Sequence, residues 1–167
     1  MPATRDDLFH RFDCLGIKTR TREHATVFTV EEARALRGEI PGGHCKNLFL
    51  KDGAGAVFLI VCLEDARVDL KTAPARIGSK RLTFGKPQLL MEVLGVEPGS
   101  VTPFGLINDG AGRATVILDA GMMEHELLNY HPLRNDATTT ISSADLVRFI
   151  RSCGIEPRIV AAGGGSL

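Results

Sequence analysis

The stretch CKNLFLKDGAGAVFLIVCL (residues 45–63) decides the fold, because it holds two apolar runs on either side of a glycine turn. Residues 45–52 and 56–63 are each typical of a strand, and the GAG between them is typical of a hairpin turn. The runs are mostly apolar, which indicates strands covered on both faces. The sequence therefore predicts an antiparallel strand pair beneath covering helices.

The rest of the chain alternates helical and strand patterns with glycine-rich breaks. Leu8, Phe12 and Leu15 repeat at helical spacing before Gly16, and Thr29 with Glu32 has the spacing of a capping box. Residues 68–78 are predicted to be helical or irregular, and residues 96–109 a long loop. Helices are predicted over 5–15, 30–38, 86–95 and 142–154, and further strands over 25–30, 81–85, 113–122, 126–132 and 156–162.

The composition predicts one globular domain over residues 1–167, with 44% hydrophobic and 24% charged residues. We expect a mixed α/β (α+β) fold with a largely antiparallel sheet surrounded by helices. The 20 basic and 20 acidic residues balance, so a nucleic-acid partner would need a local basic patch.

The cysteine spacing and the length of the apolar runs indicate the compartment in which the protein is expected. The four cysteines form no C-x-x-C pair, which favours free thiols in a reducing, cytoplasmic compartment. The start of the chain lacks the apolar core of a signal peptide. The longest apolar run, residues 56–63, is too short to span a bilayer, so no membrane partner is expected.

Four polar residues, His44 to Asn47, stand directly before a buried strand segment. Lys46 could be an ordinary solvent-exposed lysine. At the rim of a sheet it could instead hold a phosphate, polarise a carbonyl or form an imine. His44 and Cys45 are a poor base–nucleophile pair, because adjacent strand residues point to opposite faces. No role follows from the sequence for these two residues.

Two further features could belong to a pocket. The segment GSVTPFGLIND (residues 99–109) is either a connector or a substrate clamp built from backbone groups. His131 precedes Pro132 at the end of a predicted strand, where it is either a pocket wall or part of a surface turn. His24 is another candidate, without an assigned role.

A basic segment spans residues 70–91, with no acidic residue in it. It is either a solvated face or a patch that follows nucleic-acid phosphates. Arg81 and Lys80 are the candidates for contact with a nucleic acid. The basic residues are Lys71, Arg76, Lys80, Arg81 and Lys86.

Four segments in order resemble the YbaK/prolyl-tRNA synthetase-associated domain family, and within it the free-standing editing proteins of the ProXp-ala type. They are REHATVFTVEEA (22–33), GGHCKNLFLKD (42–52), GKPQLLMEVLGVEPGSVTPFGLIND (85–109) and NYHPLRNDATTTIS (129–142). The resemblance extends from about Leu8 to Arg158. One departure is visible: relatives often carry prolines after the first histidine, whereas this chain reads HATVFT.

The resemblance implies hydrolysis, in trans, of alanine wrongly attached to tRNA(Pro). It places the catalytic lysine at Lys46 and substrate-binding residues at Asn47, at Gly99 and Pro103 of the G-x-x-x-P loop, and at His131. The implied sheet is mixed and partly barrel-like. The implied partners are the acceptor end of tRNA(Pro) carrying alanine and, transiently, prolyl-tRNA synthetase; no metal or other cofactor is implied.

An activated ester needs little covalent machinery, so a positioned water, a nearby cation and a small pocket are sufficient. Two alternatives remain open. One is a deacylase for cysteine or serine on tRNA, and the other is a non-catalytic module that binds the tRNA acceptor stem. The intact Lys46 argues against the binding module.

Overall fold

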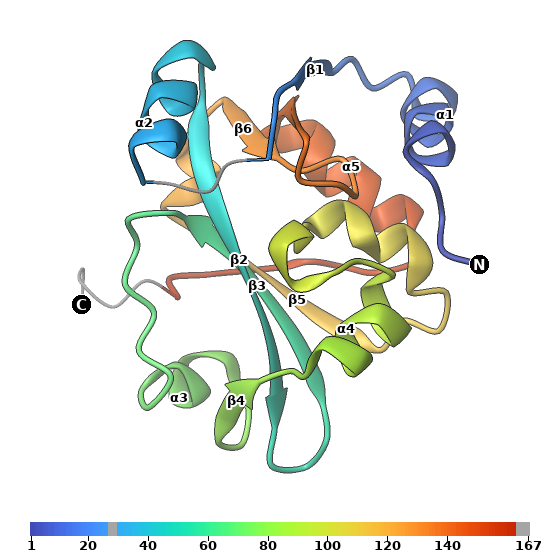
Figure 1. Cartoon of the computed structure of the whole chain (residues 1–167). Coiled ribbons are helices and arrows are strands. Elements are labelled where there is room, and N and C mark those ends of the chain that lie inside the picture. The colour runs from blue at the N-terminus through green and yellow to red at the C-terminus, as the bar shows by residue number, and fades with distance from the viewer. Residues whose placement is uncertain (27–29, 163–167) are drawn as a thin grey trace.

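A computed structural model describes residues 1–26 and 30–162 of the chain, without the side chains of residues 30, 32, 33 and 37. Within these residues an 8-stranded mixed sheet runs in the order β1-β7-β6-β2-β3-β5-β8, and β4 pairs with β2. Helices pack on both sides of this sheet (Figure 1). The mixed α/β fold class predicted from the sequence is therefore confirmed.

The predicted hairpin is the centre of the sheet. β2 (Gly43–Asp52) and β3 (Val57–Leu63) pair antiparallel along their length, from Cys45 opposite Leu63 to Lys51 opposite Val57. β2 also pairs antiparallel with β4 (Leu82–Phe84), and its first two residues pair in parallel with β6 (Leu127–Tyr130). β2 thus joins the two halves of the sheet.

The outer strands leave the sheet open. On one side β3 is followed by the parallel strands β5 (Ala114–Asp119) and β8 (Arg158–Val160). On the other side β6 is followed by the antiparallel strands β7 (Ala137–Ser142) and β1 (Arg20–Glu23). β1 and β8 end the order at opposite edges, so the described strands form an open sheet and not a closed barrel.

The larger core lies between one face of the sheet and three helices. α1 (Arg5–Leu15) starts with a Thr4–Asp7 capping box, α4 (Pro87–Leu94) begins on a proline, and α5 (Ser143–Ser152) is capped by Ser142. These caps satisfy the free amides that a helix start exposes. Three fully buried rings, Phe12, Phe104 and Phe149, meet edge-on in this core with centroids 5.3–5.5 Å apart.

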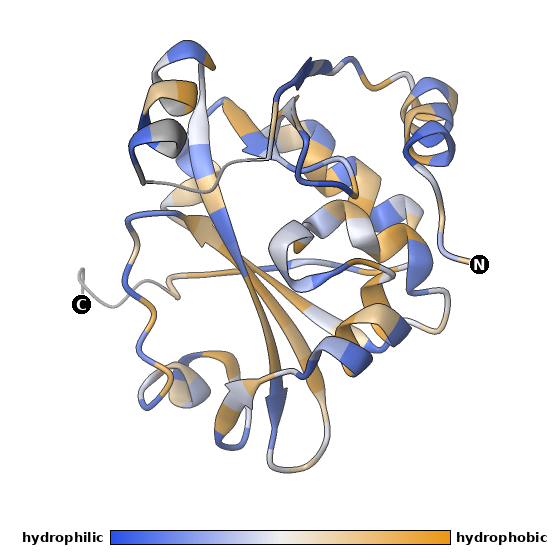
Figure 2. Ribbon diagram, viewed as in Figure 1, coloured by the Kyte–Doolittle hydropathy of each residue, from blue (hydrophilic) through white to orange (hydrophobic). Residues whose placement is uncertain are grey.

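A second core covers the other face of the hairpin. Leu50 and Ile60 pack there with Leu82 and with Ala73 and Ile77 of α3 (Ala73–Ile77). The two cores explain why β2 and β3 are apolar at successive positions, since side chains on both faces are buried. Figure 2 shows the same pattern, with hydrophobic residues along the central strands and hydrophilic residues on the outer helix surfaces.

Several boundaries differ from the sequence predictions. The predicted strand at 25–30 falls mainly on residues 27–29, which lie outside the described residues. The Thr29 cap predicted for the next helix lies there too, and Val30 begins that helix, α2 (Val30–Glu39). The long loop contains two 3-10 turns, at Pro98–Ser100 and Pro103–Asn108. β1 and β7 were not predicted. Among the described residues, no helix has the length and apolar character needed to cross a membrane.

Candidate active site

A cavity of about 220 Å³ lies where β2, β6 and β7 meet the 98–103 loop. Asn47, Gly99 and His131, three of the predicted site residues, line this cavity. They come from β2, from the loop and from the end of β6, so only the tertiary fold brings them together. The wall also contains amide, hydroxyl and thiol groups that the sequence analysis did not assign to it.

His131 presents one free ring nitrogen. Its Nδ1 donates a hydrogen bond to the carbonyl oxygen of Ala137 at 3.0 Å, which fixes the tautomer and leaves Nε2 as an acceptor. Burial lowers the pKa of His131, and the nearby His24 lowers it further, while the Ala137 bond and Asp136 oppose the shift. His131 is therefore a neutral imidazole near pH 7.

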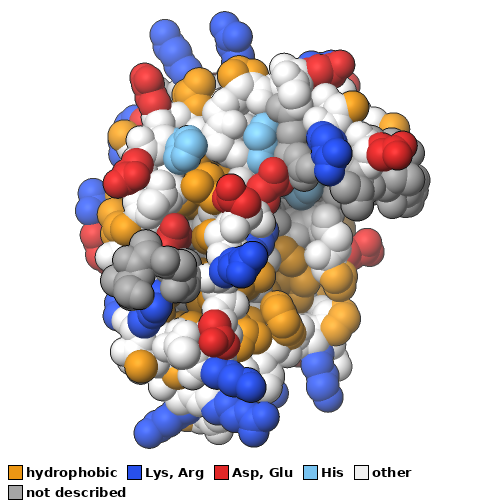
Figure 3. All heavy atoms as spheres, turned by 90° about the vertical axis from the view of Figure 1, so that its left-hand side faces the viewer, with side chains coloured by type: hydrophobic (Ala, Val, Ile, Leu, Met, Phe, Trp, Pro, Cys, Tyr) orange, Lys and Arg blue, Asp and Glu red, His pale blue; other side chains and the backbone are white. Residues whose placement is uncertain are grey.

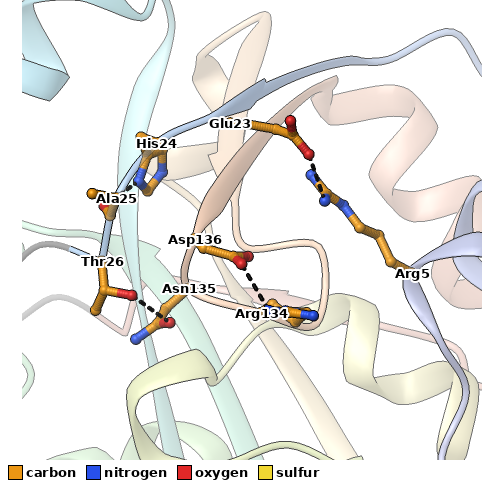
Figure 4. Close-up of polar contacts among 8 residues, drawn as sticks. All are labelled: Arg5, Glu23, His24, Ala25, Thr26, Arg134, Asn135 and Asp136. Carbon is orange, nitrogen blue, oxygen red and sulfur yellow. Dashed lines mark hydrogen bonds and ion pairs between the residues drawn. The ribbon is translucent and has the colours of Figure 1, made fainter.

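His24 lies on the same wall and connects two segments. Its Nδ1 donates to the Ala25 carbonyl at 2.9 Å, so its Nε2 accepts from the Thr138 hydroxyl at 2.8 Å. Thr26 donates to Asn135 at 3.4 Å, as Figure 4 shows. These bonds hold residues 24–26 against the 135–138 segment beside the cavity.

Asn47 connects β2 to the glycine–proline loop. Its Nδ2 donates to the Val101 carbonyl at 3.1 Å, which fixes the orientation of the amide. Its Oδ1 is buried and has no hydrogen-bond partner among the described residues. An acceptor in that state favours a donor from outside the chain.

The loop residues differ in their roles. Gly99 is exposed on the cavity wall, and its backbone is not left-handed; an added Cβ would meet Asn135 Nδ2 at 3.4 Å. Pro103 is buried and opens the 3-10 turn, capped by the Thr102 hydroxyl, without lining the cavity. Pro103 can therefore shape the loop but does not form the wall.

Lys46 does not line the cavity. Cys45 and Asn47 on either side of it do, and successive side chains along a strand point to opposite faces. The Lys46 ammonium instead donates to the carbonyl oxygen of Ala66, in the segment that leads from β3 toward α3. Lys46 is half-buried there.

His44 and Cys45 both line the cavity, although they are neighbours on β2, and they bind different groups. His44 Nε2 donates to the Ile40 carbonyl at 3.1 Å, and the Cys45 thiol points to the Gly43 carbonyl at 3.6 Å. Burial raises the pKa of Cys45 to about 11. Cys45 is a protonated thiol and not an activated nucleophile.

The basic segment lies away from the cavity, around α3 and β4. Lys80 and Arg81 are both exposed, and Arg81 borders a hollow with Lys51 and Thr83. On the face seen in Figure 3, histidine side chains lie in the upper half, and several lysine and arginine side chains gather at the lower end while others project at the upper edge. Arg81 and His131 line different hollows, so the structure separates them.

The described residues contain no group of three or more His, Cys, Asp or Glu side chains that could hold a metal ion. The cavity offers the imidazole acceptor of His131, the unpaired amide oxygen of Asn47, the carboxylate of Glu64 and a set of hydroxyl and thiol groups. Such a site can orient a small polar group and a water molecule. Fold and cavity together fit a domain that holds a small ligand at the edge of a mixed sheet.

The chain belongs to the aminoacyl-tRNA editing domain family, whose model matches residues 24–149. Its relatives include the prolyl-tRNA editing protein ProX of Acetoanaerobium sticklandii, with 34% identity over 145 residues, 86% of this chain and 88% of the relative. The prolyl-tRNA synthetase associated domain-containing protein 1 of Danio rerio is 37% identical over 149 residues, 88% of this chain and 81% of the relative. The family resemblance predicted from the sequence is confirmed.

The fold has counterparts among solved structures. The crystal structure of a candidate trans-editing enzyme for prolyl tRNA synthetase matches with a TM-score of 0.72 over 99% of this chain and 100% of that one. The two sequences are only 18% identical, so this match speaks for the fold.

Proposed function

We propose that this protein is a trans-editing deacylase that hydrolyses Ala-tRNA(Pro). The observation that carries the proposal is the cavity of about 220 Å³, which joins Asn47, Gly99 and His131 in a member of the editing-domain family. The names of the relatives point to prolyl-tRNA as the tRNA concerned. A cavity of this size suits a small amino acid.

The reaction needs positioned groups more than covalent ones. Water attacks the ester carbonyl, the ribose oxygen leaves, and the neighbouring ribose hydroxyl can assist the water. The Nε2 acceptor of His131 and the unpaired Oδ1 of Asn47 are placed to accept hydrogen bonds from the α-ammonium group or the water. Orientation of this kind can supply most of the rate enhancement.

Lys46 has a different task in this proposal: it positions the 3′ end of the tRNA. Its ammonium lies on the face of β2 away from the cavity, so it contacts the terminal nucleotide and not the amino acid. The Ala66 carbonyl that it binds lies between β3 and α3. Lys80 and Arg81 come after α3 in the chain. A tRNA arriving over α3 and β4 would meet Arg81 and Lys80 first and Lys46 next.

Proline is excluded by size. A pocket that fits a methyl side chain rejects the larger pyrrolidine ring by steric clash, whereas attraction alone gains little from one methyl group. The backbone of Gly99 and the ring of His131 form parts of the wall that the clash requires. The cognate prolyl ester therefore survives.

A panel of tRNA(Pro) species carrying alanine, serine, cysteine or proline tests the proposal under single-turnover conditions. We expect the alanyl ester to be hydrolysed fastest and the prolyl ester to persist. Faster hydrolysis of the cysteinyl or seryl ester would assign the chain to a sister activity. Binding of the tRNA without hydrolysis of any ester would assign it to a non-catalytic acceptor-stem module.

A further inference from the structure

Cys45 and Tyr130 form a continuous part of the cavity wall, from β2 and β6. The two side chains are neighbours, since each changes the pKa of the other. The protons of both groups are already used: Tyr130 donates to the Met122 sulfur at 3.2 Å, and the Cys45 thiol points to the Gly43 carbonyl. The groups that a ligand would contact at this part of the wall are a sulfur atom and an aromatic ring.

The side-chain amide of Asn129, the residue before Tyr130, also has its donors and its acceptor in hydrogen bonds within the protein. Its Nδ2 donates to the carbonyls of Pro41 at 3.0 Å and Gly43 at 3.2 Å, and its Oδ1 accepts from the Thr140 hydroxyl.

At the part of the wall formed by Cys45, Tyr130 and Asn129, a hydroxyl group would find no free donor and only weak acceptors. The cavity's carboxylate, Glu64, follows Leu63 at the end of β3. Loss of the hydroxyl group's hydrogen bonds to water would then go uncompensated.

We infer that Cys45 and Tyr130 form the subsite for the amino-acid side chain, and that the Cys45 thiol sets the preference for a methyl group over a hydroxymethyl group. This inference rests on the proposed deacylase function and adds a specificity-determining residue to it. The protonated thiol acts as a small apolar surface, the usual behaviour of a buried cysteine. Tyr130, which is 3% exposed, is fixed behind it.

Two substitutions at Cys45 test the subsite, with kcat/KM measured for alanyl, seryl and 2-aminobutyryl esters of tRNA(Pro). Cys45→Ser keeps the size and supplies a hydroxyl partner, so the seryl-to-alanyl ratio should rise about tenfold, the effect of one hydrogen bond. Cys45→Ala enlarges the subsite, so the 2-aminobutyryl-to-alanyl ratio should rise at least about tenfold, the effect of one methylene. A purely structural role would lower all rates together.

Cys153→Ser is the matched control, because Cys153 is also half-buried but lies at the end of α5, outside the cavity. Its ratios should equal those of the wild type. Thermal melting checks that each variant folds. If only one of the two Cys45 variants folds, that variant alone tests the subsite. Unchanged ratios in a folded Cys45 variant, with an active wild type, would overturn the subsite and leave the deacylase intact. A wild type inactive on every ester would overturn the deacylase itself.

Discussion

At the scale of single residues, the site depends on side chains whose hydrogen bonds are fixed by the backbone. His131 is bound to Ala137, Asn47 to Val101 and Lys46 to Ala66, in each case through a main-chain carbonyl. Such bonds set the orientation of each group before a substrate arrives. Preorganisation of this kind is what a site without covalent chemistry requires.

The Nε2 atom of His131 should remain an unprotonated hydrogen-bond acceptor at mildly acidic pH. Its pKa is lowered by burial and by His24, against the opposing effects of the Ala137 bond and Asp136, so the ring stays neutral below the usual midpoint near 6.5. We expect kcat/KM for alanyl-tRNA(Pro) to fall only as the pH drops below about 6.5. His131→Asn, which does not titrate, should lose this acid limb. An identical limb in the variant would assign it to another group.

Lys46→Ala should nearly abolish deacylation while changing stability little, because Lys46 is half-buried with a single main-chain partner. If Lys46 holds the terminal nucleotide, the loss should appear in both tRNA affinity and single-turnover rate. Lys18→Ala is the control, because Lys18 is exposed and lies outside both the cavity and the hollow beside Arg81. A Lys46→Ala enzyme with wild-type single-turnover rates would remove Lys46 from the mechanism.

At the scale of elements, the 3-10 turn at Pro103–Asn108 fixes the loop that faces the cavity. The turn packs against the end of α4, where Gly105 lies so close to Leu94 that an added Cβ would be 2.9 Å from its backbone oxygen and its Cβ. Asn108 also donates to the Leu94 carbonyl at 2.8 Å. The loop is therefore anchored from outside the site.

Gly105→Ala should lower the free energy of unfolding by about 1–3 kcal/mol, the usual effect of overpacking, because backbone atoms must move. Gly110→Ala is the control, since no atom lies within 4 Å of its added Cβ. Urea denaturation of the two variants measures the difference. Equal stability of Gly105→Ala and Gly110→Ala would show that the loop is not anchored on α4.

The sequence could predict the elements with strong patterns. β2, β3 and β5 are apolar because both of their faces are buried, and α1 ends at Leu15, as its spacing and Gly16 predict. β7 was missed because its threonines are polar, although Thr139 is buried and bonded to Thr21 at 2.7 Å. β1 was missed because it is a short, charged edge strand.

The site was predictable only in part. Asn47, Gly99 and His131 were identified through the family resemblance, and they share one cavity. Tyr130 and Thr138 could not be placed there, because the face that a strand residue occupies depends on a register that the sequence does not reveal. The same register puts Lys46 on the other face.

At the scale of the whole molecule, the net charge of zero leaves tRNA binding to local groups. The exposed side chains of Arg81 and Lys80 lie at the α3–β4 end, on the side toward which the Lys46 ammonium points. Under the proposed function, this arrangement would give the molecule an amino-acid side and a nucleotide side, with β2 between them.

Arg81→Gln should weaken tRNA(Pro) affinity, and wild-type affinity should fall as salt rises. If Arg81 contacts one phosphate, the slope of log K against log salt should flatten by roughly one unit in the variant. Arg148→Gln, on α5, is a control arginine on another element. An unchanged slope for Arg81→Gln would make this residue part of the ordinary solvated surface.

The central claim is that the cavity hydrolyses alanyl esters of tRNA(Pro) and spares prolyl esters. The most direct measurement is the ratio of single-turnover hydrolysis rates of Ala-tRNA(Pro) and Pro-tRNA(Pro) by the wild-type protein. We predict a ratio of at least about 100, since steric exclusion exceeds the value of one methylene. A ratio near one, or hydrolysis of neither ester above the uncatalysed rate, would contradict the account.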